Sequence, residues 1–253
     1  MTISAKVWKA YIAKLRAIND KAADEMRAWL RVHGTADRNA MIDYAFALAQ
    51  KYGDASATLS ASMYDAVARR SGKYLSTAMP AEPASMKEVA RAVVGAAKSG
   101  NYDIVADAVG RLVKLAGVDT TMYNAIRDGA EWAWVPVGDT CAYCVALAAN
   151  GWQRASMKAL EGGHAEHIHA NCDCTYAIRF DERGSVDGYD PDKWRGMYLT
   201  ADLDGDAPTS DNRINALRRQ FYQQNRETIL AQKRDAYEKS RELESSAAEE
   251  VRA

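Results

Sequence analysis

The feature that most constrains this chain is a cluster of metal-binding side chains within residues 141–174. All four cysteines and three of the four histidines of the 253-residue sequence lie in this stretch. Thiol and imidazole groups gathered in this way usually bind a metal ion, and Zn²⁺ is the commonest ion in such sites. The candidate ligands are Cys141, Cys144, His164, His167, His169, Cys172 and Cys174. The sequence therefore predicts that this segment folds around a metal ion.

The spacing of the candidates divides them into two halves. A turn between Cys141 and Cys144 can bring both sulfurs to one side, and His169-x-x-Cys172-x-Cys174 supplies the second half. A structural zinc site needs four ligands. The preferred set is the four cysteines, with His169 in place of Cys172 or Cys174 as the alternative. A group of cysteines held by the fold without a metal is the other interpretation.

A catalytic zinc site makes further demands, which the sequence does not meet in full. Such a site needs three protein ligands, an open position and a nearby general base. His164-Ala-Glu166 matches the His-x-Glu of zinc deaminases, but the Cys-x-x-Cys pair lies upstream of it instead of downstream. The sequence also contains no Gly-rich phosphate loop and no nucleophile elbow. We therefore expect no enzymatic activity.

Besides a purely structural role for the metal, the sequence leaves two functions open. One is a zinc-dependent nucleic-acid enzyme, such as a treble-clef-like nuclease that uses His164, His167 or His169 with Glu166. The other is a zinc-ribbon DNA-binding module. A net charge of −1 favours neither, because it provides no basic surface for the chain as a whole.

The distribution of apolar residues predicts neither a membrane span nor a secretory signal. The sequence has no run of 18 or more apolar residues, so we expect no membrane span and no membrane partner. Its first residues lack the basic region and apolar core of a secretory signal. We therefore expect the cysteines to meet a reducing cytosol, which favours metal binding over disulfides.

Residues 1–135 have the pattern of a helical region. Apolar residues recur at three- and four-residue steps, β-branched residues are few, and Ser85-x-x-Glu88 is a capping box. Glycines at 34, 53, 100 and 117 are interpreted as helix ends. The predicted helices cover about 4–31, 36–51, 55–76, 85–100, 101–117 and 119 into the Trp132/Trp134 region.

The remaining residues are predicted to form three further parts. Residues 136–183 form a Cys/His module with a β-favouring strand at 175–180, and 184–209 form an acidic, Gly- and Pro-rich connection. Residues 210–253 contain no Gly or Pro and form one long charged helix. The predicted fold class is mainly α with a small α+β module: an N-terminal helical region, a Cys/His-knotted module and a long C-terminal helix.

The two halves of the Cys/His cluster resemble a known motif. In tailed-phage minor capsid proteins, the MuF-like head-morphogenesis proteins, a Cys-x-x-Cys pair is followed by His-x-Asn-Cys-x-Cys. The resemblance is greatest to the type found in phages of actinobacteria. The matching residues are Trp134-Val-Pro-Val-Gly-Asp-Thr-Cys141-Ala-Tyr-Cys144 and His169-Ala-Asn-Cys172-Asp-Cys174.

The resemblance implies a structural role in the phage head. It implies that the chain enters the procapsid near the portal, inside the shell, after its synthesis in the host cytoplasm. The implied partners are the portal protein and the major capsid protein, with room for weak contact with packaged DNA. The motif carries over to Cys141, Cys144, His169, Cys172 and Cys174 as the ligands of a structural Zn²⁺.

Overall fold

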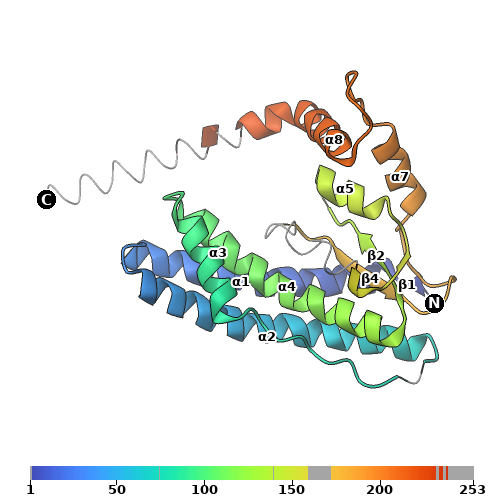
Figure 1. The fold of residues 1–253 in the computed structure, drawn as a ribbon, viewed down its shortest axis with the longest axis horizontal. Helices are drawn as coiled ribbons and strands as arrows, with labels where there is room; N and C mark the ends of the chain where they lie inside the picture. The colour runs from blue at the N-terminus through green and yellow to red at the C-terminus, as the bar shows by residue number, and fades with distance from the viewer. Residues whose placement is uncertain are drawn as a thin grey trace, which may run out of the picture.

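The computed structural model contains a long helical bundle with a small sheet and further short helices at one end (Figure 1). It describes residues 2–73, 75–138, 140–158 and 172–231, together with 234, 235 and 238. The bundle contains α1 (Ala5–His33), α2 (Arg38–Arg70), α3 (Met86–Ala97) and α4 (Tyr102–Asp128). The other elements are β1 (Thr2–Ile3), β2 (Glu131–Val135), α5 (Ala142–Ala148), β3 (Gln153–Arg154), β4 (Thr175–Arg179), β5 (Ser185–Val186), α7 (Pro191–Leu199) and α8 (Ser210–Gln224). The predicted fold class, mainly helical with a small sheet module, is confirmed.

Helix α1 and the capping box of α3 form as their local sequences predict. Ser4 caps α1 by accepting a hydrogen bond from the backbone of Val7, and the helix ends at Gly34, whose φ is 67°. At α3, the Ser85 hydroxyl accepts from the Glu88 backbone while the Glu88 carboxylate accepts from the Ser85 backbone. Both features depend on a few neighbouring residues, so tertiary contacts are not needed to specify them.

The predicted helix break at Gly53 is wrong, because α2 runs through this residue without interruption. A Cβ atom at Gly53 would lie 2.8 Å from the Cβ of Pro83, which belongs to the segment between α2 and α3. The absence of a side chain therefore permits a close approach between two parts of the chain. Glycine at this position serves packing and not helix termination.

The predicted break at Gly117 is also wrong, since α4 continues to Asp128. This glycine lies against α2, and the predicted sixth helix is the second half of α4. Helix α4 ends at Gly129 in the left-handed conformation. The expected helical continuation into Trp132 and Trp134 is wrong as well, because both residues belong to strand β2.

The sheet joins β2 to the segment that carries two of the cysteines. Strand β2 is central and pairs antiparallel with β3 on one side and β4 on the other. Trp134 lies opposite Tyr176 in the register, and their rings meet edge to face with centroids 4.8 Å apart. The predicted strand at 175–180 is confirmed as β4.

The helical region and the sheet module share one apolar core. Trp8 of α1, Tyr64 of α2 and Met122 of α4 are buried in the same cluster as Trp132 and Trp134 of β2. The parallel pair of β1 and β5 also attaches the start of the chain to the far side of the module. A second apolar cluster fills the other half of the bundle and includes Met26, Leu30, Leu48 and Val109.

Residues 184–231 contain more structure than the predicted acidic connection and continuous helix. The predicted connection over 184–209 contains β5 and α7, and α7 packs with α5 and α8 around Val145 and Leu217. The predicted uninterrupted helix from 210 is wrong at Asn225, where α8 ends and the Asn225 side chain donates to the Phe221 carbonyl at 3.0 Å. The Asn225 backbone also donates to the same carbonyl at 3.1 Å, so the Phe221 oxygen accepts two hydrogen bonds where α8 ends. Residues 239–253 lie outside the described part of the chain.

The described helices give no candidate membrane span: none combines sufficient length with sufficient apolarity.

Changing Asp119 to Asn is expected to stabilise the protein above pH 6. Burial and, as the smaller cause, the charge of Glu88 raise the pKa of this α4 carboxyl from 3.8 to about 6. The folded protein therefore retains a proton that the unfolded chain releases, so stability falls as pH rises from about 4 to 6. Asparagine cannot ionise, so the variant avoids the free-energy cost of a buried carboxylate. We expect this cost to be about 1–2 kcal/mol after allowing for the partial exposure of Asp119.

Urea unfolding of both proteins at several pH values measures the Asp119 effect. The difference between variant and parent should be near zero at pH 4 and reach its full value above pH 6. Changing Asp43 to Asn provides the control, because this aspartate is exposed on α2. A difference for Asp119→Asn that does not vary with pH would contradict the expectation.

Candidate metal centre

Three thiols from two parts of the chain meet beside the sheet. The sulfur atoms of Cys144, Cys172 and Cys174 all lie within 4.8 Å of one another. The sulfur atoms of Cys144 and Cys172 are separated by 3.3 Å. Cys144 and Cys174 are buried, at 2% and 0% exposure, whereas Cys172 is half-buried. The group therefore lies at the edge of the interior, with Cys172 as its most accessible member.

The local structure around each cysteine explains how the sulfurs converge. Cys141 is the N-cap of α5 and its sulfur accepts a hydrogen bond from the backbone of Cys144 at 3.5 Å. Cys144 is in the first turn of α5 and faces inward. Cys172 and Cys174 are two residues apart just before β4, and this spacing places side chains on the same face of an extended chain. The backbone of Val137 donates to the Cys174 sulfur at 3.4 Å and fixes its position.

The three sulfurs fit a soft metal ion such as Zn²⁺. Thiolates bind zinc at about 2.3 Å, so two sulfurs on one tetrahedral ion lie about 3.8 Å apart. The mutual distances of up to 4.8 Å are compatible with this arrangement after a small adjustment. None of the four cysteines, all of which the structure describes, forms a disulfide. The group could therefore hold a metal ion through three thiolates.

The structure brings together three of the five predicted ligands. Cys141 contacts Cys144 through the cap of α5, but its sulfur is not a member of the group of three. His169 lies outside the described residues, as do His164, His167 and Glu166. The complete five-residue ligand set therefore stays a prediction.

The thiols influence one another's ionisation. Hydrogen bonds with Cys144 and Cys174 lower the pKa of Cys172, and the positive charge of Lys114 acts in the same direction. Hydrogen bonds with Cys141, Cys172 and Cys174 raise the pKa of Cys144, and burial adds to this effect. Cys172 is therefore the member of the group that ionises first.

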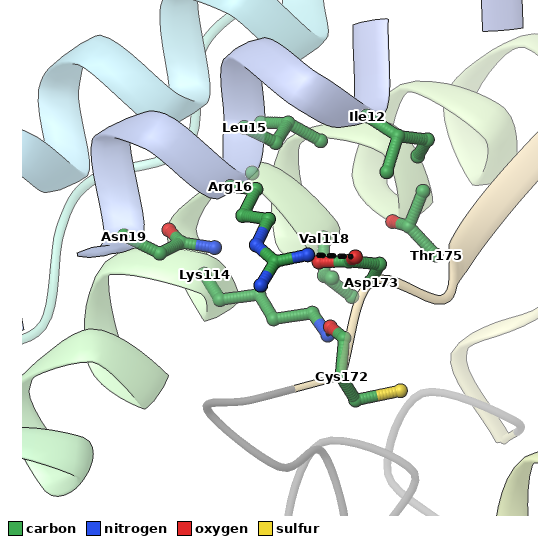
Figure 2. A pocket seen from close by; sticks show the side chains of 10 residues that line it. Ile12, Leu15, Arg16, Asn19, Lys114, Val118, Cys172, Asp173 and Thr175 are labelled. Atoms are coloured by element: carbon green, nitrogen blue, oxygen red, sulfur yellow. Dashed lines mark hydrogen bonds and ion pairs between the residues drawn. The ribbon is translucent and has the colours of Figure 1, made fainter. Parts of the chain in front are cut away.

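Lys114 is a residue near the centre that sequence reasoning missed. It lies on α4 and is only 6% exposed, and its Nζ donates to the backbone carbonyl of Cys172. Figure 2 shows it beside Asp173, whose carboxylate is ion-paired with Arg16 of α1 at 3.1 Å. The structure places Lys114 on a buried face of α4, since Gly110 and Val118, one helical turn before and after it, are also buried. A lysine on such a helix face is unusual.

The fold and the thiol group together define a mainly helical protein with a small, cysteine-bearing sheet module. The model of the VG15 protein family matches residues 2–201, which include the bundle, the sheet and α7. The chain therefore belongs to the VG15 family, and this membership indicates a phage-encoded protein. Comparison with curated proteins and with solved structures gives no match.

Proposed function

We propose that this chain is a minor capsid protein of a tailed phage and acts in head morphogenesis. In this proposal it is a MuF-like protein without enzymatic activity, and it works through protein–protein contacts inside the head near the portal. One observation carries the proposal: the phage family match spans the segment that has the capsid-type motif from Cys141 to Cys174. The proposed partners are the portal protein and the major capsid protein, with weak contact with packaged DNA.

Within this function, the thiol group is proposed to hold a structural Zn²⁺. The burial of Cys144 and Cys174 supports this assignment, because a catalytic zinc keeps a coordination position open to substrate. The location of the group also supports it. Its members belong to α5 and the segment before β4, so one ion would tie together two parts of the module that are separated in sequence.

The surface of the C-terminal segment supports a role based on contacts. Ile214 and Leu217 of α8 are buried against α5 and α7. Further along the same segment, Tyr222 and Leu230 are 44% and 37% exposed. The proposal assigns contact with a protein partner to this exposed part of the segment.

Affinity purification from phage-infected cells tests the proposal. The tagged chain should recover the portal and major capsid proteins, and mass spectrometry would identify them. Uninfected cells expressing the same tagged chain are the control. Purified protein that cleaves DNA with a divalent metal, and loses this activity when His167 or His169 is changed, would contradict the proposal. High DNA affinity that falls steeply with salt would contradict it as well, since it would favour a DNA-binding module.

A further inference from the structure

Lys114 lies in a small cavity between the helical bundle and the thiol group. The cavity has a volume of about 10 Å³ and is enclosed by α1, α4 and the segment that leads into β4. Figure 2 shows the Lys114 side chain crossing this space toward Cys172, next to the Arg16–Asp173 ion pair. The Lys114 ammonium therefore reaches from the bundle to the backbone of a candidate metal ligand.

A metal ion bound by these thiolates would carry a net negative charge, which the ammonium of Lys114 can balance. Three thiolates and one Zn²⁺ carry a net charge of about −1, and a fourth thiolate would make it about −2. A net charge is unfavourable in a buried site unless it is balanced nearby. Lys114 brings a positive charge to the backbone of Cys172, while the carboxylate of Asp173 is engaged by Arg16.

We propose that Lys114 is a positioning residue of the metal centre. Its ammonium holds the backbone of Cys172 in place and offsets the negative charge of the metal–thiolate group. This inference rests on the zinc centre proposed above. Lys114 belongs to α4, whereas the thiols belong to α5 and the segment before β4. In this proposal the helical bundle therefore contributes a residue to the metal site.

Zinc affinity of the full chain under reducing conditions tests the inference. Zn²⁺ is titrated in competition with a chromophoric chelator for the native protein and for Lys114→Met, which keeps the length of the side chain without its charge. We expect the affinity to fall about 10- to 100-fold, as it does when groups that support metal ligands are removed. The thermal stability of the metal-free variant should stay close to that of the parent, because the removal of a buried charge offsets the lost hydrogen bond to the Cys172 carbonyl. A role in packing alone would lower that stability and leave zinc affinity per folded molecule unchanged.

Two further variants separate charge from packing. Lys114→Gln retains a donor for the Cys172 carbonyl but has no charge, so it should lose affinity by less than Lys114→Met, which loses both the donor and the charge. It also replaces Lys114→Met if that variant does not fold. Arg16→Met removes a cation on another side of the same cavity, but the Arg16 side chain is 62% exposed and screened by water. This control should change zinc affinity by less than about 5-fold.

Several results would overturn the inference. One is native affinity in Lys114→Gln, which would show that the charge has no effect. Another is an equal loss of affinity in Arg16→Met and Lys114→Met, which would indicate a general disturbance of the cavity. A native chain that binds no zinc would overturn both the metal centre and the role of Lys114. Native binding with unchanged Lys114 variants would overturn the role of Lys114 alone.

Discussion

Replacing Cys144 by serine is expected to abolish zinc binding and to unfold the sheet module, while the far half of the helical bundle remains folded. Cys144 is the only member of the thiol group of three that comes from α5. Structural zinc sites contribute about 10 kcal/mol or more of binding free energy at neutral pH, and this energy stabilises the folded state. Its loss is comparable to the whole free energy of unfolding of an ordinary domain, which is about 5–15 kcal/mol.

The two apolar clusters determine where unfolding should stop. The cluster around Trp132 and Trp134 lies next to the thiols and includes the sheet, so it should lose its packing with the module. The cluster around Met26 and Val109 belongs to the other half of the bundle and contains no residue of the module. Amide hydrogen exchange should therefore show lost protection in β2 and β4 and retained protection in the second half of α1.

Two companion variants identify the fourth ligand. In Cys141→Ser the hydroxyl is a good replacement for the N-cap of α5, so any loss of zinc reports on metal binding and not on the helix. Loss in Cys141→Ser with retention in His169→Ala would assign Cys141, and the reverse result would assign His169. Elemental analysis and chelator titration provide the measurement. A Cys144→Ser protein that binds zinc with native affinity would contradict the proposed centre.

Local signals in the sequence predicted much of the fold correctly. The capping box at Ser85 and Glu88, the amphipathic face of α1 and the β-favouring residues of β4 are each local features of the sequence. The same holds for part of the site. The spacing between Cys172 and Cys174 suits an extended chain, and Cys144 follows its cap residue by one helical turn.

Features that depend on distant contacts were not predictable in this way. A glycine in a helical pattern has the same local signature whether it ends the helix or admits a neighbouring element, so Gly53 and Gly117 were both misinterpreted. Lys114 was missed for a similar reason. Its function depends on Cys172, which lies 58 residues further along the chain.

Replacing Gly117 by valine is expected to destabilise the bundle by about 3 kcal/mol, at the upper end of the usual penalty for overpacking. A Cβ at this position would lie 2.6 Å from the Ser56 hydroxyl oxygen, 2.8 Å from that of Ser60 and 3.3 Å from the Ser56 carbonyl. Ser60 cannot rotate away freely, because its hydroxyl is hydrogen-bonded to Tyr11 at 3.0 Å. The backbone carbonyl cannot rotate at all, so α2 and α4 must separate where they pack most closely.

Thermal unfolding of the metal-loaded protein measures the Gly117 effect, and Gly95 of α3 provides the matched control. For a chain of this size, 3 kcal/mol corresponds to a fall in Tm of about 6–12 °C. A Cβ at Gly95 would meet nothing within 4 Å, so Gly95→Val should change stability by less than about 0.5 kcal/mol. Equal effects at the two positions would mean that the contact between α2 and α4 does not require a glycine at position 117, because helix propensity itself disfavours glycine. A large fall at Gly117 alone would show that the absence of a side chain there permits the close approach of α2 and α4.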